Sequence, residues 1–452
     1  MAPRLDKKQL NTKLFQIALP ISVQGVVSAT LGMVDDLMVG MLGPTELAGV
    51  GVATQLTMIH YMLLFGLISG TATYMAQFYG SGDMKNIRKC IGFGQTLLAA
   101  VGVLFFLIAV FRPQEVLAFY TDDPAVQAEA ESYLRVVSVQ FLFLAFSAPM
   151  EMAFKATQQT RIPMVISTVV FSTNTILNYI FIFGKFGAPA LGVAGAALGT
   201  AVARGLQMLL DLLFYLRKGN CFRGSYLSFF GWSGELIQRV MKNAWPTTCN
   251  EMLWGLGQTM YVAAFNRIGT LDYAAYQAAN SITNIFAFAA FSVGDASLIM
   301  VGQKLGEGDR EGAIVVAKHL LKVGTIFGSG VGLLLMALAK PLSLLFNLTP
   351  AGQHLTFLIL LIFGLFMGVN LMNGILITGI LRGGGDTRFA MIAECSCVWF
   401  VAVPLAFAAA LLWHLPIYLA VLLTKAEEIT KWFILMKRFR SEKWANTVIT
   451  GL

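Results

Sequence analysis

Twelve apolar windows, each about as long as a membrane-spanning helix, alternate with short polar segments along the chain. A helix of about 20 apolar residues is long enough to cross the hydrocarbon core of a bilayer. The pattern therefore predicts an all-α, polytopic membrane protein with twelve transmembrane helices. The windows lie near residues 14–40, 50–77, 91–111, 133–154, 162–183, 188–216, 244–266, 273–301, 319–339, 353–381, 389–412 and 416–436.

The windows fall into two sets of six, which a glycine-rich polar stretch separates. We predict an N-terminal lobe at residues 1–216, a cytoplasmic linker at 217–243 and a C-terminal lobe at 244–452. A shift of 226 residues brings identical residues of the two lobes into register. Because six is an even number, the two pseudo-symmetric six-helix bundles should have the same orientation in the membrane. The matches include Ala18 with Ala244, Pro20 with Pro246, and Gln77, Gly80, Gly82 and Asp83 with Gln303, Gly306, Gly308 and Asp309.

Composition and charge agree with a membrane location. Charged residues make up 12% of the chain and hydrophobic residues 57%, whereas about 25% of a soluble domain is charged. The net charge of +8 is better explained by Lys and Arg in cytoplasmic loops than by nucleic-acid binding. The N-terminal arm, with Arg4, Lys7 and Lys8, and the C-terminus should both be cytoplasmic. We expect a multi-pass protein of the plasma (inner) membrane and no nucleic-acid partner.

The sequence contains no catalytic or cofactor signature. It has no HExxH or GxSxG motif, and its four histidines and five cysteines lack metal-ligand spacing. The glycine-rich segments that begin at Tyr79 and Arg382 do not fit the spacing of a phosphate-binding loop, so we predict tight turns there. We expect a protein that is not an enzyme and has no cofactor.

Two adjacent carboxylates, Asp35 and Asp36, lie near the end of the first apolar window. An ionisable side chain in the middle of a bilayer costs about 2.5 to 3.5 kcal/mol, so such groups usually face an ion, a partner helix or a water-filled cavity. We interpret the pair as a candidate ion or substrate site. The alternative is a structural pair with one member solvated at the helix end.

Amide and hydroxyl groups in the fifth and sixth windows offer further oxygen atoms. Asn174 and Asn178 are four residues apart and so share a helix face. Gly195 and Gly199 have the GxxxG spacing that lets helices approach closely, and Thr200 adds a hydroxyl. With Asp35 these groups form an oxygen-rich set suited to Na+ or a proton. Hydrogen bonding between helices is the alternative role.

The second lobe carries its own polar groups. Glu251 and Trp254 lie three residues apart, hence near one helix face. A carboxylate beside an aromatic ring can hold an organic cation; a packing Trp and a Glu satisfied by a neighbouring helix are the alternative. Gln277 lies in the eighth window. Glu151 and Glu394 are polar residues without a partner that the sequence identifies.

Several segments together resemble the multidrug and toxic compound extrusion family: ALPISVQ, MVDDLMVGMLG, LNYIFIFGKFGAPALGVAGAALGT and GILRGGGDTRFAM. The resemblance spans essentially the whole chain. It implies twelve helices in two lobes with a cleft between them, and export of cationic amphipathic compounds by Na+ or H+ antiport.

The resemblance also assigns roles to residues. The first-helix aspartate of the family corresponds to Asp35, and Asp36 stands where the family has Thr. The cation site of the N-terminal lobe corresponds to Asn174, Asn178 and Thr200, so that Na+, if it is the coupling ion, would bind Asp35, Asn174 and Asn178. Gln277 corresponds to a glutamine that lines the drug cleft.

The expected function is secondary active export of organic cations, coupled to Na+ or H+. Small-molecule organic cations and membrane lipids are the expected partners, and the protein is expected to be a monomer. The alternative is a lipid or lipid-linked oligosaccharide flippase of the same superfamily, which would prefer a basic cleft for phosphates. Arg204 and Lys425 are basic residues placed inside the windows.

Overall fold

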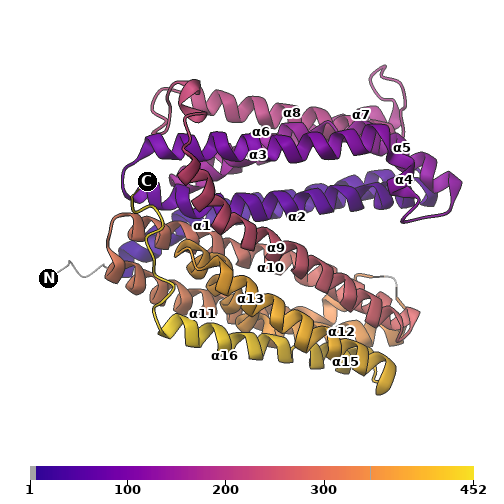
Figure 1. Ribbon diagram of the computed structural model, residues 1–452. Coiled ribbons are helices and arrows are strands. Elements are labelled where there is room, and N and C mark those ends of the chain that lie inside the picture. The colour runs from indigo at the N-terminus through magenta and orange to yellow at the C-terminus, as the bar shows by residue number, and fades with distance from the viewer. Residues whose placement is uncertain (1–6, 347, 452) are drawn as a thin grey trace. The chain divides into compact units, whose positions relative to one another are not determined.

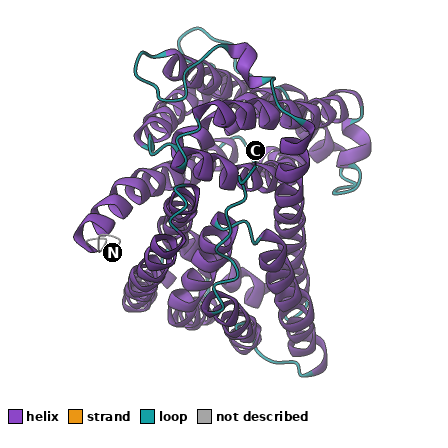
Figure 2. Ribbon diagram, turned by 60° about the vertical axis from the view of Figure 1, so that its left-hand side comes forward, coloured by secondary structure: helices purple, strands orange, loops and turns teal. Residues whose placement is uncertain are grey.

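The computed structural model describes residues 7–346 and 348–451, so Arg4 lies outside the described residues. In these residues the chain forms helices and loops, with no β-strand (Figures 1 and 2). All twelve predicted windows are helical, which confirms the all-α class. The helices are α1 (Lys7–Gly40), α2 (Pro44–Gly80), α3 (Met84–Phe111), α4 (Pro113–Leu117), α5 (Pro124–Val137), α6 (Gln140–Ala156), α7 (Arg161–Phe183), α8 (Val193–Leu216), η1 (Tyr226–Phe229), α9 (Gly234–Asn266), α10 (Thr270–Gly306), α11 (Arg310–Ser343), α12 (Pro350–Gly374), η2 (Ile375–Leu381), α13 (Thr387–Cys397), η3 (Val398–Ala402), α14 (Val403–Phe407), η4 (Ala408–Leu412), α15 (Ile417–Thr424) and α16 (Ala426–Arg440).

The described part of the chain has nine helical segments that are long and apolar enough to cross a membrane. A tenth span comes from α5 and α6, which are bent by 48° where they meet. The two remaining windows coincide with α9 and with α15 and α16. α15 and α16 have 8 and 15 residues, so each is shorter than a membrane span. Both windows also carry polar side chains that are buried inside the protein, among them Asn250, Glu427 and Glu428.

The repeated Gly-x-Gly-Asp sequence has the same local structure in both copies. Gly82 and Gly308 have φ angles of 77° and 78°, which glycine adopts without the steric penalty of a side chain. The aspartate that follows caps a helix: Asp83 accepts a hydrogen bond from the backbone of Asn86 at the start of α3, and Asp309 accepts one from Gly312 at the start of α11. The sequence match therefore marks equivalent turns between helices.

The chain divides into two compact units. Unit 1 contains the described residues up to Ser22, then Ala72–Ser81 and the chain from Arg239 on; unit 2 contains Val23–Thr71 and Gly82–Gln238. Parts of α1 and α2 thus group with the second half of the chain, whereas we predicted them in the N-terminal lobe. Hydrogen bonds explain this grouping, since Lys13 donates to Gln303 and Gln77 donates to the carbonyl of Gly383.

Within the predicted linker, residues 234–243 form the first turns of α9. Leu236, Val240 and Ala244 are buried at four-residue spacing and hold these turns against the protein. The polar composition of the stretch concealed this apolar stripe. The lobe boundaries at residues 216 and 244 stay a prediction.

In unit 1, the ends of α2 and α10 approach each other through glycines. A Cβ atom on Gly80 would lie 2.0 Å from the carbonyl oxygen of Gln303, and one on Gly306 would lie 1.9 Å from that of Gln77. Both distances are far below van der Waals contact, so neither position accepts a side chain without a shift of backbone. Since Gln77 corresponds to Gln303 and Gly80 to Gly306 in the repeat, the two contacts are reciprocal.

Candidate functional site

Four polar side chains that the sequence singled out lie together in unit 2. Asn178 of α7 donates to Asp35 Oδ1 of α1 at 2.6 Å and lies 3.1 Å from Asn174 Oδ1. Asn174 in turn donates to Thr200 Oγ1 of α8 at 3.2 Å. We call Asp35, Asn174, Asn178 and Thr200 the Asp35 cluster. Three helices thus bring one carboxylate, two amides and one hydroxyl to one place.

A close approach of α7 and α8 shapes this cluster. A Cβ atom on Gly199 would lie 2.1 Å from Asn178 Oδ1, and one on Gly195 would lie 2.5 Å from the carbonyl oxygen of Phe181. The two glycines therefore let the amides of α7 reach α8, as their spacing predicted. Asn178 is fully buried, and its Oδ1 has no hydrogen-bond partner among the described residues.

An unpaired oxygen of this kind can serve as a cation ligand. Buried polar atoms almost always have a partner, so one without a partner points to a ligand or a water molecule. The carboxylate of Asp35 supplies negative charge beside it, and the oxygens of Asn174 and Thr200 lie within one hydrogen-bonded chain. The donor set fits Na+, which prefers oxygen ligands, and also a proton on Asp35.

Asp35 and Asp36 differ in their surroundings. Asp35 is half-buried and bonded to Asn178, whereas the side chain of Asp36 is exposed. Successive residues of a helix point about 100° apart, so only one of two adjacent carboxylates can face α7. In this structure that residue is Asp35.

Glu151, for which the sequence identified no partner, is well satisfied in unit 2. It forms an ion pair with Lys155 at 2.9 Å and accepts hydrogen bonds from Gln24 at 2.6 Å and Gln207 at 3.4 Å. Gln207 also accepts from Arg204, whose second nitrogen donates to the hydroxyl of Tyr61. Glu151 and Lys155 have the i, i+4 spacing of a helical ion pair, which is the sequence feature that could have indicated this partner.

In unit 1, Glu251 is paired with a basic residue of the same unit. Arg382 donates to Glu251 Oε1 at 2.6 Å, and its side chain is only 1% exposed. Trp254 lies three residues further along α9. Among the described residues, the recorded side-chain partner of Glu251 is Arg382 and not Trp254. Trp254 is 40% exposed, and Gln277 of α10 is also exposed.

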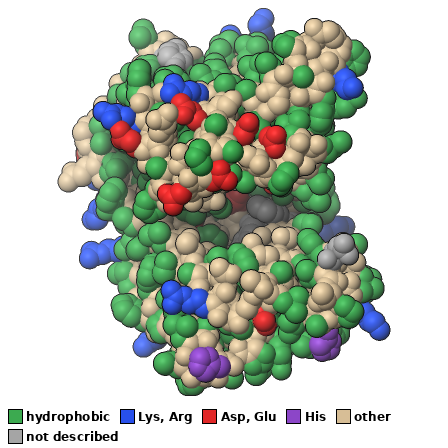
Figure 3. All heavy atoms as spheres, turned by 90° about the vertical axis from the view of Figure 1, so that its right-hand side faces the viewer, with side chains coloured by type: hydrophobic (Ala, Val, Ile, Leu, Met, Phe, Trp, Pro, Cys, Tyr) green, Lys and Arg blue, Asp and Glu red, His purple; other side chains and the backbone are tan. Residues whose placement is uncertain are grey.

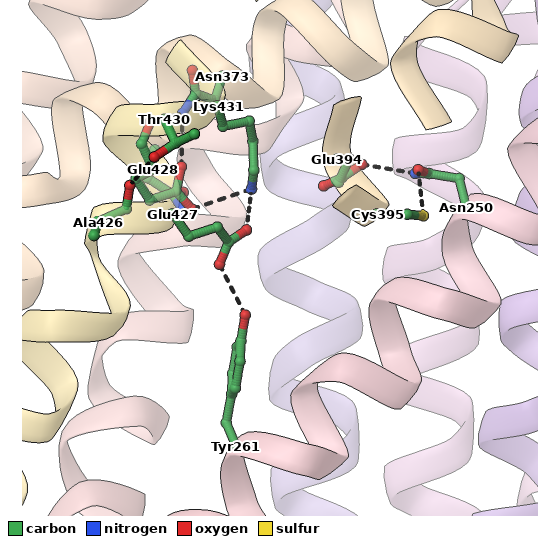
Figure 4. Close-up of polar contacts among 11 residues, drawn as sticks. Asn250, Tyr261, Asn373, Glu394, Cys395, Ala426, Glu427, Glu428, Thr430 and Lys431 are labelled. Atoms are coloured by element: carbon green, nitrogen blue, oxygen red, sulfur yellow. Dashed lines mark hydrogen bonds and ion pairs between the residues drawn. The ribbon is translucent and has the colours of Figure 1, made fainter. Parts of the chain in front are cut away.

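A buried charge cluster of unit 1 is centred on α16 (Figure 4). Lys431 lies 2.6 Å from Glu427 and 3.5 Å from Glu428, the i, i+4 and i, i+3 pairs expected on one helix face. Tyr261 of α9 donates to Glu427, and Asn373 of α12 donates to Glu428. The cluster joins three helices through paired groups.

Glu394, the other acidic residue without an assigned partner, lies on α13. Figure 4 shows it pointing toward Asn250 of α9, which donates to its carboxylate at 2.7 Å. Asn250 also accepts from Cys395 Sγ at 3.6 Å. These contacts involve residues 144 or more positions apart, so no local sequence pattern indicated them.

Acidic side chains gather at the end of unit 2 formed by the loops around α4 and α5, and Figure 3 shows this face. Glu115 is 64% exposed, and Asp122 and Asp123 are exposed in the loop before α5. Arg112 and Arg135 form ion pairs with Glu115 and Glu131 in the same region. This end of the helices is the one that we predict to face outward.

Comparisons with known proteins agree on one family. The MatE family model matches residues 20–180 and 246–408. A probable multidrug resistance protein NorM of Thermotoga maritima is 24% identical over 449 residues, which cover 99% of this chain and 96% of the relative. A multidrug resistance protein MdtK of Pectobacterium atrosepticum is 25% identical over 88% of this chain and 87% of its own.

Solved structures show the same fold. A multidrug resistance MATE family transporter in an outward-facing conformation superposes with a TM-score of 0.87 at 17% identity, over 97% of each chain. A transporter of the MOP superfamily from Pyrococcus furiosus gives a TM-score of 0.86 at 18% identity, again over 97% of each chain. These likenesses extend over almost the whole chain, and the twelve-helix arrangement agrees with them.

Proposed function

Because this chain belongs to the MatE family, whose model covers both halves of it, we propose that it is a secondary active multidrug exporter. It exchanges organic cations and other amphipathic compounds for Na+ or H+. The relatives named multidrug resistance proteins support export of small molecules. The nine apolar helices and the bent pair support a multi-pass location in the plasma (inner) membrane.

The observation that carries the coupling proposal is the Asp35 cluster. It contains a carboxylate, Asp35, that can be charged or neutralised, and a buried oxygen, Asn178 Oδ1, that has no partner among the described residues. A cation that binds there changes the charge of the site and the hydrogen bonds of α1 with α7. A driving ion can promote export only if its binding favours one conformation over another. Na+, if it is the coupling ion, would be held by Asp35, Asn174 and Asn178.

We assign substrate contacts to unit 1. Trp254 and Gln277 are exposed polar or aromatic groups on α9 and α10, and a Trp face attracts organic cations. Glu251 can contribute negative charge only in competition with Arg382, which it pairs with here. The proposal therefore gives Trp254 and Gln277 the direct contacts and Glu251 an electrostatic contribution that the Arg382 pair reduces.

Dye efflux from proteoliposomes tests this function. The purified chain is reconstituted, loaded with a cationic dye, and exposed to an inward Na+ gradient or an inward H+ gradient in separate samples. Export that follows one gradient and stops when an ionophore removes it is the expected result. Dye export that is independent of both gradients would overturn the proposal. Movement of labelled lipid in place of dye would also overturn it and would favour the flippase alternative.

A further inference from the structure

One face of α8 continues from the Asp35 cluster toward the C-terminal end of the helix. Thr200, Arg204, Gln207 and Asp211 are spaced four, three and four residues apart, which places them on the same side of α8. The rise from Thr200 to Asp211 is about 16 Å. This polar face therefore leads away from the Asp35 cluster toward the side of the membrane that we predict to be cytoplasmic.

Asp211 lies at the far end of this face without a counter-charge. Its side chain is 1% exposed, and its Oδ2 atom has no hydrogen-bond partner among the described residues. The charged group that acts on it is Glu151 of α6, which has the same sign. An ionised carboxylate buried without a counter-charge is strongly unfavourable. Asp211 therefore needs a proton or another cation.

Two more buried oxygens in this region have no partner among the described residues other than Asp211 itself. Ser147 of α6 lies within hydrogen-bonding reach of the Asp211 carboxylate, and its hydroxyl has no other hydrogen-bond partner within the described residues. Gln95 of α3 donates to the carbonyl of Phe146 at 3.2 Å, which places its side chain next to Ser147, and its own Oε1 atom is unpartnered. Oxygen atoms of this kind are the ligands that monovalent and other hard cations take in proteins.

Unlike Asp211, the neighbouring Glu151 does not need a bound proton or other cation. Lys155 neutralises its charge, and Gln24 and Gln207 donate to its two oxygens. Arg204 is held by Gln207 and Tyr61 and lies on α8 between Thr200 and Asp211. Its positive charge separates the Asp35 cluster from the Asp211 end of the face, so a cation can occupy either position as a distinct site.

We propose that Asp211, with Ser147 and Gln95, forms a second binding site for the coupling cation, a proton or Na+. This proposal rests on the coupled antiport proposed above and extends it. The Asp35 cluster takes up the cation from one side of the membrane, and the Asp211 site holds it before release on the other side. The site uses a carboxylate on α8, a hydroxyl on α6 and an amide on α3.

Cation binding by the purified full-length chain tests this proposal. Infrared difference spectra between low and high pH detect carboxyl groups that gain a proton, and equilibrium binding of radioactive sodium counts Na+ sites. The wild-type protein should show two cation-dependent signals, of which Asp35→Asn removes one and Asp211→Asn the other. Asp211→Asn should also slow gradient-driven dye efflux by about tenfold. The two methods decide between a proton and Na+.

The Asp35→Asn protein keeps the test valid if Asp211→Asn does not fold. In Asp35→Asn, the cation-dependent signal of the Asp211 site must remain, and Ser147→Ala in that background must weaken it. Asp122→Asn, which changes an exposed loop carboxylate of the same unit, serves as the control and should leave both signals unchanged. Loss of every signal in Asp35→Asn, or two intact signals in a folded Asp211→Asn, would overturn the second site. Uncoupled export by the wild-type protein would instead overturn the proposed function.

Discussion

At the scale of single residues, the surroundings of Asp35 and Asp36 give two adjacent carboxylates different roles. Asp35 receives a hydrogen bond from a fully buried amide, whereas Asp36 is exposed on the next position of the same helix. The adjacent pair was evident in the sequence. Which of the two faces α7 depends on the rotation of α1 about its axis, which short-range patterns do not determine.

Asp35→Asn should abolish gradient-driven efflux while the protein still inserts into the membrane and binds some substrate. Asparagine keeps the size and hydrogen bonding of aspartate but removes the charge that a coupling cation neutralises. Efflux from proteoliposomes under the effective gradient should fall at least about tenfold. Asp36→Asn is the matched control and should retain most of the efflux. The reverse result would transfer the coupling role to Asp36.

Glu251→Gln should weaken export of cations more than export of neutral compounds of similar size. It also breaks the ion pair of Glu251 with the buried Arg382, and breaking a buried ion pair costs about 3 to 5 kcal/mol. The double variant Glu251→Gln, Arg382→Gln removes both charges and restores stability in part, so it isolates the effect on transport. Parallel efflux assays with a cationic and a neutral dye measure the difference. Equal losses for both dyes in the double variant would show a purely structural role.

At the scale of the helices, the periodicity of apolar residues located every span, but not the breaks within them. The bend between α5 and α6 and the π-helical turns η2 and η3 lie inside windows that read as continuous helices. The partners of Glu251 and Glu394 were likewise hidden, because Arg382 and Asn250 lie more than 130 residues from them. Long-range pairing of this kind follows from how helices pack, which a single sequence does not specify.

Gly199→Ala should disturb the packing of α7 on α8 and with it the Asp35 cluster. The new methyl group would lie 2.1 Å from Asn178 Oδ1, so the amide or the helix must move, at a cost of about 1 to 3 kcal/mol. A lower melting temperature and weaker cation-dependent stabilisation of the purified protein are the expected results. Gly205→Ala on the same helix is the control, because its methyl group meets Phe143 at an ordinary 3.4 Å. Identical behaviour of the two variants would contradict this account of the glycine.

At the scale of the whole molecule, the distribution of basic residues predicts that both termini and the stretch after α8 are cytoplasmic. Cys221 provides a native reporter of this topology, since it is exposed in that stretch, whereas Cys90 and Cys397 are buried. A membrane-impermeant thiol reagent should label it in inside-out vesicles and not in right-side-out ones. Cys221→Ser should remove the label. Labelling only from the outside would reverse the orientation.

The rate of this labelling should depend on pH. Partial burial of its sulfur raises the pKa of Cys221 above the usual value for a thiol, and only the thiolate reacts. A raised pKa means less thiolate at neutral pH, so labelling should be slow there. The rate should continue to rise with pH beyond 9.0, the ordinary pKa of a cysteine thiol. A rate that levels off at or below pH 9 would show a pKa that is not raised and would contradict this prediction.

The reciprocal contact of Gly80 with Gln303 and of Gly306 with Gln77 also carries information about ancestry. Two copies of one chain that meet across a twofold axis make such contacts in pairs, because residue i touches j and j touches i. Fusion of the two genes would preserve the contacts while the carboxylates of the two copies diverged. The reciprocal contacts at the ends of α2 and α10 are those expected if this region descends from the interface of a homodimer of six-helix chains.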